Sequence, residues 1–223
     1  MGVLIAIEGI DGAGKGTQAA RVAETAAGRG RSVASFSFPL YDGNPFSRAI
    51  ADYLNGEFGA VDEVHPEPAG LLYAGDRFHA KPRLLAALAG SDLVVCDRYV
   101  ASNAAHQGAK LAGEARTRLL DWLEEVEYGE FGLPRPQLVV LLDAPVALAR
   151  ELVGRKAARG YTTLEADIHE ADAGHSEATR EVYLELARRD GWRVVPTAGE
   201  DGAPRDVDEI ADDVWRAVEP LLT

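Results

Sequence analysis

The amino-acid sequence predicts an α/β fold: a five-stranded parallel sheet flanked by helices on both faces. Short apolar runs alternate with helical stretches along the 223 residues. The strongest of these runs are apolar at successive positions, which is typical of strands covered on both faces. Alternation of strands and helices then implies right-handed crossovers and a doubly wound sheet.

Five segments have the pattern of strands. The first is apolar and ends at Gly9, and the second stops at Pro39. The third and fourth are nearly continuous apolar runs that end on a carboxylate, and the fifth is weaker. The expected strands are Val3–Glu8, Ser32–Phe38, Asp92–Asp97, Gln137–Asp143 and Trp192–Pro196.

Seven segments between and after these strands are helical candidates. The third contains Pro82, which predicts a kink or a break there because proline removes a helical hydrogen bond. The expected helices are Thr17–Ala27, Phe46–Leu54, Leu71–Leu88, Glu114–Glu127, Val146–Ala158, Glu177–Arg189 and Val207–Leu221. With no repeat and no convincing linker, residues 1–223 are expected to form one domain.

Composition narrows the class of protein. The single cysteine, Cys96, excludes an internal disulfide framework and fits a reducing compartment. A formal charge of −13 argues against a general nucleic-acid binder. No apolar run approaches the roughly 18 residues that span a bilayer, and the N-terminus does not have the pattern of a signal peptide. A cytoplasmic protein without membrane or nucleic-acid partners is therefore expected.

The most informative segment is GIDGAGKG, residues 9–16, followed by Thr17. It lies between an expected strand and an expected helix, which is the context of a phosphate-binding loop. Its glycines permit backbone conformations that a Cβ would block, and the positive end of the following helix favours an anion. Lys15 adds a charge that can reach the β- and γ-phosphates. Gly16 departs from the usual motif, which has Ser or Thr as a hydroxyl ligand for Mg²⁺.

Asp97 and Arg98 directly follow the third expected strand. Ligands of open parallel sheets bind beyond the carboxyl ends of the strands. Asp97 and Arg98 are therefore expected at the same edge as the phosphate loop.

Five segments in this order resemble those of the thymidylate kinase family, in its bacterial, actinobacterial form. They are IEGIDGAGKGTQ (7–18), FPLY (38–41), LLYAGDRF (71–78), DRYVASNAAHQG (97–108) and REVYLELA (180–187). The resemblance implies a P-loop NTPase fold with a mobile lid at approximately 150–170 and a homodimer. It also implies transfer of the γ-phosphoryl group of ATP to dTMP, giving dTDP and ADP, with Mg²⁺.

The same resemblance assigns roles at the phosphates. Lys15 and Arg98 are expected to be catalytic, with Arg98 clamping the acceptor phosphate and Asp97 orienting that edge. Asp11 is expected near the sugar and the metal, and Phe38 and Tyr41 in the monophosphate pocket. The ATP-binding set is Gly9, Ile10, Asp11, Gly12, Ala13, Gly14, Lys15, Gly16 and Thr17.

Three further positions correspond to residues that bind the base. Tyr73 matches an aromatic residue that stacks on thymine, Arg77 an arginine that hydrogen-bonds the base, and Asn103 an amide that reads its ring nitrogen. Stacking supplies affinity without choosing a base, so Arg77 and Asn103 would supply the choice. His106 stands where many relatives have a tyrosine near the sugar, which puts selection against ribonucleotides in question.

The expected lid is basic and ends in carboxylates. Arg155 and Arg159 are candidates for the arginine that reaches the transferring phosphoryl group, because the phosphate loop itself has no arginine. Glu170 is a candidate contact in the sugar or metal region. Asp167 and His169 belong to the same acidic segment.

Two other functions are compatible with the motifs. GAGKGTQ also suits an adenylate-type kinase, although DRYVASNAA and FPLY speak against it. A nucleotide switch that holds or hydrolyses ATP without an acceptor would have no use for Tyr73, Arg77 and Asn103.

Overall fold

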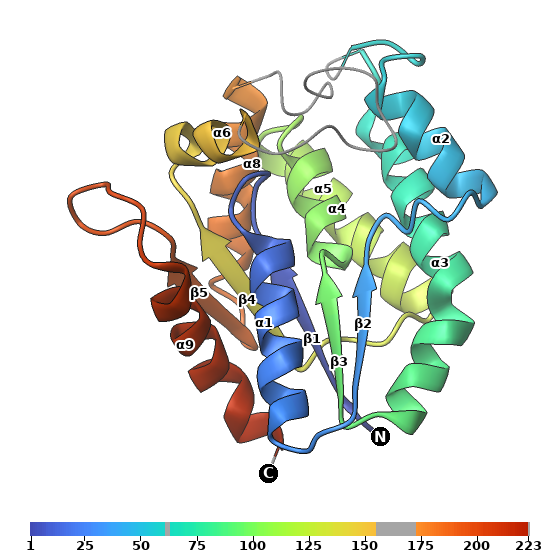
Figure 1. Ribbon diagram of the computed structural model, residues 1–223. Helices are drawn as coiled ribbons and strands as arrows, with labels where there is room; N and C mark the ends of the chain where they lie inside the picture. Colours follow the sequence, from blue (N-terminus) through green and yellow to red (C-terminus); the bar gives the residue numbers. More distant parts are fainter. Residues whose placement is uncertain (61–62, 155–172, 223) are drawn as a thin grey trace.

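The computed structural model describes residues 1–60, 63–154 and 173–222, and its centre is a five-stranded sheet (Figure 1). The strand order is β2-β3-β1-β4-β5 and every neighbouring pair is parallel. The strands are β1 (Val3–Glu8), β2 (Val33–Ser37), β3 (Leu93–Asp97), β4 (Leu138–Asp143) and β5 (Trp192–Pro196). The predicted five-stranded parallel sheet is confirmed.

Strand register brings the carboxyl ends of β1, β2 and β3 to one edge of the sheet. Ile7 of β1 and Ser37 of β2 both lie opposite Asp97, the last residue of β3. The chain therefore leaves these three neighbouring strands at the same level, where the connections that follow them meet.

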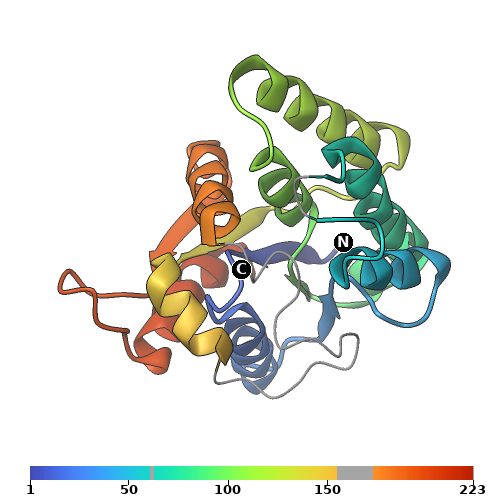
Figure 2. The same ribbon diagram turned by 90° about the horizontal axis from the view of Figure 1, so that it is seen from above.

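Helices cover both faces of the sheet, as the view from above shows (Figure 2). They are α1 (Lys15–Gly28), α2 (Pro45–Leu54), α3 (Pro66–Gly90), α4 (Val100–Gly108), α5 (Gly113–Glu124), α6 (Val146–Gly154), α8 (Ala173–Leu186) and α9 (Val207–Val218). A π-helical turn, η1 (Glu125–Glu130), extends α5, and a 3-10 turn, η2 (Glu219–Leu222), follows α9.

Alternating side chains of the central strands divide the core in two. Ile5 and Ile7 pack with α1 and α9, whereas Leu4 and Ala6 pack with Leu84 and the rest of the inner face of α3. Strands buried on both faces explain why the sequence runs are apolar without alternation.

Two sequence-based expectations for the helices need correction. α3 is one continuous helix of 25 residues through Pro82, so a break there does not occur. α4 (Val100–Gly108) was not among the expected helices. Among the described residues, no helix combines the length and the apolarity needed to cross a membrane.

Candidate active site

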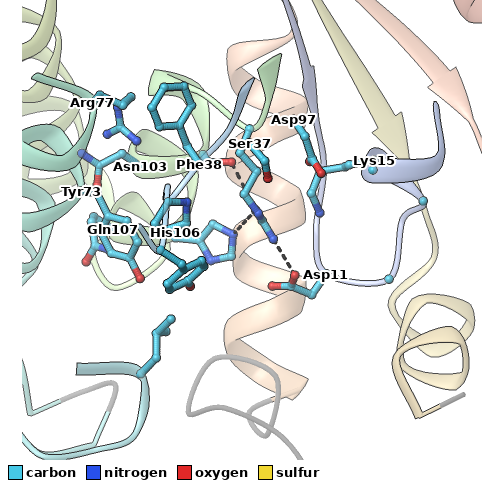
Figure 3. A pocket seen from close by; sticks show the side chains of 18 residues that line it. Asp11, Lys15, Ser37, Phe38, Tyr73, Arg77, Asp97, Asn103, His106 and Gln107 are labelled. Carbon is cyan, nitrogen blue, oxygen red and sulfur yellow. Dashed lines mark hydrogen bonds and ion pairs between the residues drawn. The ribbon is translucent and has the colours of Figure 1, made fainter. Parts of the chain in front are cut away.

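One cavity of about 290 Å³ opens at the carboxyl edge of the sheet, between the phosphate loop and α2–α4 (Figure 3). All eight residues expected to bind the acceptor line it: Asp11, Phe38, Tyr41, Tyr73, Arg77, Arg98, Asn103 and His106. Lys15, Gly12, Gly14, Gly16 and Asp97 line it as well. One cavity therefore brings the phosphate loop together with Asp97 and Arg98, as expected for residues at one edge of the sheet.

The phosphate loop is packed too tightly for side chains at two of its glycines. A Cβ at Gly12, where φ is 85°, would lie 2.0 Å from the backbone oxygen of Ala149 in α6. A Cβ at Gly9 would lie 2.6 Å from the backbone oxygen of Leu142 in β4. α1 begins at Lys15, within this segment, so the amino-terminal end of the helix lies at the cavity lining.

Lys15 is buried, and its Nζ donates a hydrogen bond to the backbone oxygen of Ile10, 2.8 Å away. Burial lowers the pKa of Lys15 to about 8, and the positive charge of Arg98 adds to the effect against the opposing pull of Asp11. The ammonium is thus held within the loop with little solvation. A phosphate placed beside it would restore its charge.

Arg98 directly follows β3 and lines the cavity. Its φ of 65° is unusual for a residue with a side chain, and its backbone N–H donates to the oxygen of Ile7 at 3.0 Å. Its Nη2 lies 2.5 Å from Oδ1 of Asp11. Burial would lower the pKa of Arg98, but Asp11 and neighbouring groups raise it, so Arg98 stays a cation.

Two further side chains flank the Arg98 guanidinium. Nη1 donates to Oγ of Ser102 at 3.2 Å and lies 3.3 Å from Nε2 of His106. The His106 ring lies edge-on to that of Tyr183, with centroids 6.4 Å apart. His106 therefore contacts the expected phosphate clamp directly.

Glu8, fully buried, ties β1 to the segment after β3. Its carboxylate accepts hydrogen bonds from the backbone N–H of Tyr99 at 2.7 Å and from the hydroxyls of Ser102 at 2.6 Å and Tyr183 at 3.0 Å. Burial raises the pKa of Glu8, while these hydrogen bonds and Arg98 oppose the rise. This network fixes the turn from which Arg98 projects.

The segment after β2 contributes Phe38, Pro39 and Tyr41 to the cavity lining. Phe38 is buried against Tyr99, Phe38–Pro39 is a cis peptide, and Tyr41 has a φ of 46°. Asp76 of α3 anchors the segment, because it accepts from the backbone N–H of Leu40 at 2.9 Å and from Nδ2 of Asn44 at 2.8 Å.

At the far end of the cavity, Arg77 and Asn103 lie next to each other, with Tyr73 close by (Figure 3). Both share a partner that the sequence reading missed: the buried carboxylate of Glu127 in η1. Glu127 accepts from Nε and Nη2 of Arg77 at 2.5 and 2.7 Å and from Nδ2 of Asn103 at 2.8 Å. Burial would lower the pKa of Arg77, yet Glu127 raises it.

Gln107 is a second residue that the sequence reading missed. It lies one helical turn beyond Asn103 on α4, lines the cavity and is fully buried. Its Nε2 and Oε1, together with Oδ1 of Asn103, form no hydrogen bond with the part of the chain that the structure describes. Buried polar groups are normally paired, so these atoms are available to a ligand.

Some expected site residues do not reach this cavity or cannot be placed. Gly9, Ile10, Ala13 and Thr17 do not line it, although they belong to the loop and to the start of α1. Arg155, Arg159 and Glu170, with most of the expected lid, lie outside the described residues.

A phosphate loop with its lysine, a facing arginine and a pocket with open hydrogen-bonding atoms are features of a P-loop kinase that phosphorylates a small nucleotide. Sequence comparison gives the family. A family model described as thymidylate kinase matches residues 7–203, and the chain belongs to the thymidylate kinase family.

Individual relatives agree with this assignment. The chain is 38% identical over 190 residues to the thymidylate kinase of Mycobacterium tuberculosis, covering 85% of this chain and 87% of that protein. It is 33% identical over 227 residues to that of Thermomicrobium roseum, covering 100% and 97%. The solved structure of the Candida albicans thymidylate kinase superposes with a TM-score of 0.76 at 22% identity, covering 98% of this chain and 92% of that one, which supports the fold.

Proposed function

We propose that this chain transfers the γ-phosphoryl group of ATP to dTMP, with dTMP in the cavity and the ATP phosphates on the phosphate loop. The observation that carries the proposal is the single cavity lined by Lys15, Arg98, Tyr73 and Asn103. Lys15 would hold the ATP phosphates and Arg98 the acceptor phosphate. Tyr73 would stack on the base, with Arg77 and Asn103 contacting its edge.

The reaction needs positive charge and alignment rather than a general base. The second pKa of a phosphate monoester is about 6, so the acceptor oxygen is already an anion at neutral pH. That oxygen bonds to the γ-phosphorus as the bond to the β,γ-bridging oxygen breaks, and ADP leaves. Lys15 and Arg98 would reduce the repulsion between the two anions and hold them in line. Arg155 or Arg159 of the expected lid would add charge at the transferring group.

The residues around the phosphate loop also fit a Mg²⁺ ion bound with ATP. Mg²⁺ in such sites takes one or two carboxylates plus phosphate oxygens and waters. A Cβ at Gly16 would lie 3.1 Å from Oδ2 of Asp97, so a carboxylate stands beside the position where the motif usually has a hydroxyl. We propose that Asp97 and Asp11 face the ion, with Glu170 as a further candidate. Bound Mg²⁺ would supply charge at the β- and γ-phosphates.

A substrate panel tests the proposed acceptor. With ATP and Mg²⁺, we expect dTMP to be phosphorylated and AMP to be a poor acceptor, measured by chromatography of the diphosphate products. Efficient phosphorylation of AMP with none of dTMP would support the adenylate-type alternative. Absence of dTMP binding in isothermal titration would support the nucleotide switch. Adding dUMP and the ribose form of TMP to the panel would show whether a site that contains His106 accepts uracil or a ribose sugar.

We further propose a cytoplasmic homodimer that uses an apolar stripe on α3. Leu71, Phe78 and Leu85 are 42%, 47% and 43% exposed and are spaced seven residues, or about two helical turns, apart. Such a stripe favours contact with another apolar surface. Light scattering should give a dimer for the natural chain and a monomer for Phe78→Glu. A monomeric natural chain would contradict the proposal.

A further inference from the structure

We infer that Glu127 is a positioning residue that sets the base preference of the cavity, by holding the amide of Asn103 and the guanidinium of Arg77 in one orientation. The inference rests on the proposed binding of dTMP. Glu127 lies in η1, is fully buried and does not itself line the cavity. It therefore acts on a bound base only through its two partners.

The orientation of the Asn103 amide follows from the chemistry of its neighbours. Its Nδ2 lies 3.0 Å from the backbone oxygen of Gly70 and 2.8 Å from Oε1 of Glu127. A carbonyl and a carboxylate can only accept hydrogen bonds, so the amide must turn its NH₂ group toward them. Both protons are then used. Oδ1 is left as a buried acceptor with no partner among the described residues.

Arg77 is held in the same way. Its Nε and Nη2 meet the two oxygens of Glu127 at 2.5 and 2.7 Å, a bidentate contact that fixes the plane of the guanidinium. The third nitrogen, Nη1, forms no hydrogen bond with the described chain, while the side chain lines the cavity. One end of the cavity thus offers a permanent donor near a fixed acceptor.

This pair of groups matches one kind of pyrimidine. Thymine and uracil present a carbonyl oxygen next to a ring N–H, which complement the arginine and the amide oxygen. Cytosine presents an amino group next to an unprotonated ring nitrogen, so donor would face donor and acceptor would face acceptor. Without Glu127, only the backbone oxygen of Gly70 would oppose a half-turn of the Asn103 amide that offers its NH₂ group to cytosine. Glu127 prevents this adaptation.

Glu127→Gln tests the inference with little change in shape. In the natural chain Oε1 accepts from both Arg77 and Asn103. In either orientation the new amide sets its NH₂ group against at least one of these N–H donors, and the negative charge that Arg77 and Asn103 share is lost, so both side chains are held less firmly. We expect the ratio of kcat/KM for dTMP to that for dCMP to fall about tenfold or more, since a hydrogen bond to a charged group typically corresponds to a factor of this size.

The ratio is insensitive to partial misfolding, because the fraction of active enzyme cancels between two substrates assayed on one sample. Glu124→Gln is the matched control. Glu124 ends α5 only three residues earlier, and it pairs at the surface with Arg135 and Arg189. We expect this variant to keep the natural ratio, because neither arginine belongs to the cavity.

A double-mutant cycle separates positioning from a general structural role. With Asn103→Ala in place, Glu127→Gln should lower the ratio by a smaller factor than it does alone, because no amide is left to orient. An unchanged ratio in Glu127→Gln, or the same factor in both backgrounds, would overturn the inference. If the natural chain does not phosphorylate dTMP at all, it is the proposed function that fails.

Discussion

The affinity of this chain for ATP should fall as pH rises, because the lysine of the phosphate loop is only partly protonated above neutrality. Lys15 has a pKa of about 8 in the ligand-free chain, compared with 10.5 for an ordinary lysine. Protonated Lys15 outnumbers the neutral form about ten to one at pH 7, and the ratio is about one to ten at pH 9. If phosphate binding requires the ammonium, the apparent Kd rises about tenfold over this interval.

Isothermal titration with a non-hydrolysable ATP analogue measures this change. The phosphate groups themselves contribute little, since their last proton is lost at a pKa of about 6. Lys15→Arg is the control, because a guanidinium stays charged across the whole range. Any slope left in that variant belongs to other groups, of which buried Glu8 with its raised pKa is the first candidate. A flat profile for the natural chain would refute the reasoning.

Lys15 should also make stability depend on pH, in the opposite direction to the affinity for ATP. Its pKa is lower in the folded chain than in the unfolded chain, so between about pH 8 and 10.5 the unfolded chain binds more protons. The contribution of Lys15 to the free energy of unfolding therefore rises with pH while the affinity for ATP falls. The difference in unfolding free energy between the natural chain and Lys15→Met, measured with denaturant, should become more favourable to the natural chain across this interval.

Three substitutions test other parts of the site. Lys15→Ala should lower kcat at least about a hundredfold, in line with the loss of one charge-stabilising group. Isothermal titration should give a largely unchanged Kd for dTMP, and an equal loss of kcat and of dTMP affinity would contradict the assignment of Lys15 to ATP. Gly12→Ala should lower the melting temperature, because its Cβ would lie 2.0 Å from the backbone oxygen of Ala149, whereas Gly28→Ala, with nothing within 4 Å of the new Cβ, should leave it unchanged or slightly raised. Asp76→Ala should raise the KM for dTMP more than that for ATP, because it releases the segment that carries Tyr41; a uniform effect on both KM values would argue against that role.

The sheet could be predicted almost residue by residue because its signal is local. The central strands β1, β3 and β4 are short apolar runs that end on a carboxylate, whereas β2 and β5 are less apolar. The observed ends of all five differ from the expected ones by one residue at most. The meeting of Lys15 with Arg98 follows from the rule that ligands bind beyond the carboxyl ends of parallel strands, whereas the order of the strands was not among the expectations.

The missed helix shows where local patterns fail. α4 lacks an apolar stripe, since Ser102, Asn103 and Gln107 are all buried polar residues. They are polar because they face the cavity or its network instead of a hydrocarbon core. Buried polar residues that face a cavity thus remove the periodicity by which a helix is recognised.

Glu127 was missed for a related reason. It lies in an acidic segment with Glu124, Glu125 and Glu130, and such runs are usually solvated. Its burial depends on Arg77, which is 50 positions away in the chain and comes from a different helix. Two charges buried together are tolerated only when both are paired, so either sequence segment alone gives no indication of the contact.

Backbone strain in this molecule coincides with the proposed acceptor site. Arg98 and Tyr41 are the non-glycine residues with positive φ among the described residues, and both line the cavity. Each such conformation costs roughly 1–3 kcal/mol, and the surrounding contacts offset it: Glu8 and Ile7 hold the turn at Arg98, and Asp76 holds the segment before Tyr41. A glycine at either position would relieve the strain but could not contact a phosphate. The buried carboxylates of Glu8 and Asp76 therefore stabilise two unfavourable turns, and these turns place the guanidinium of Arg98 and the phenol of Tyr41 at the cavity. This is the arrangement expected of a preorganised anion site.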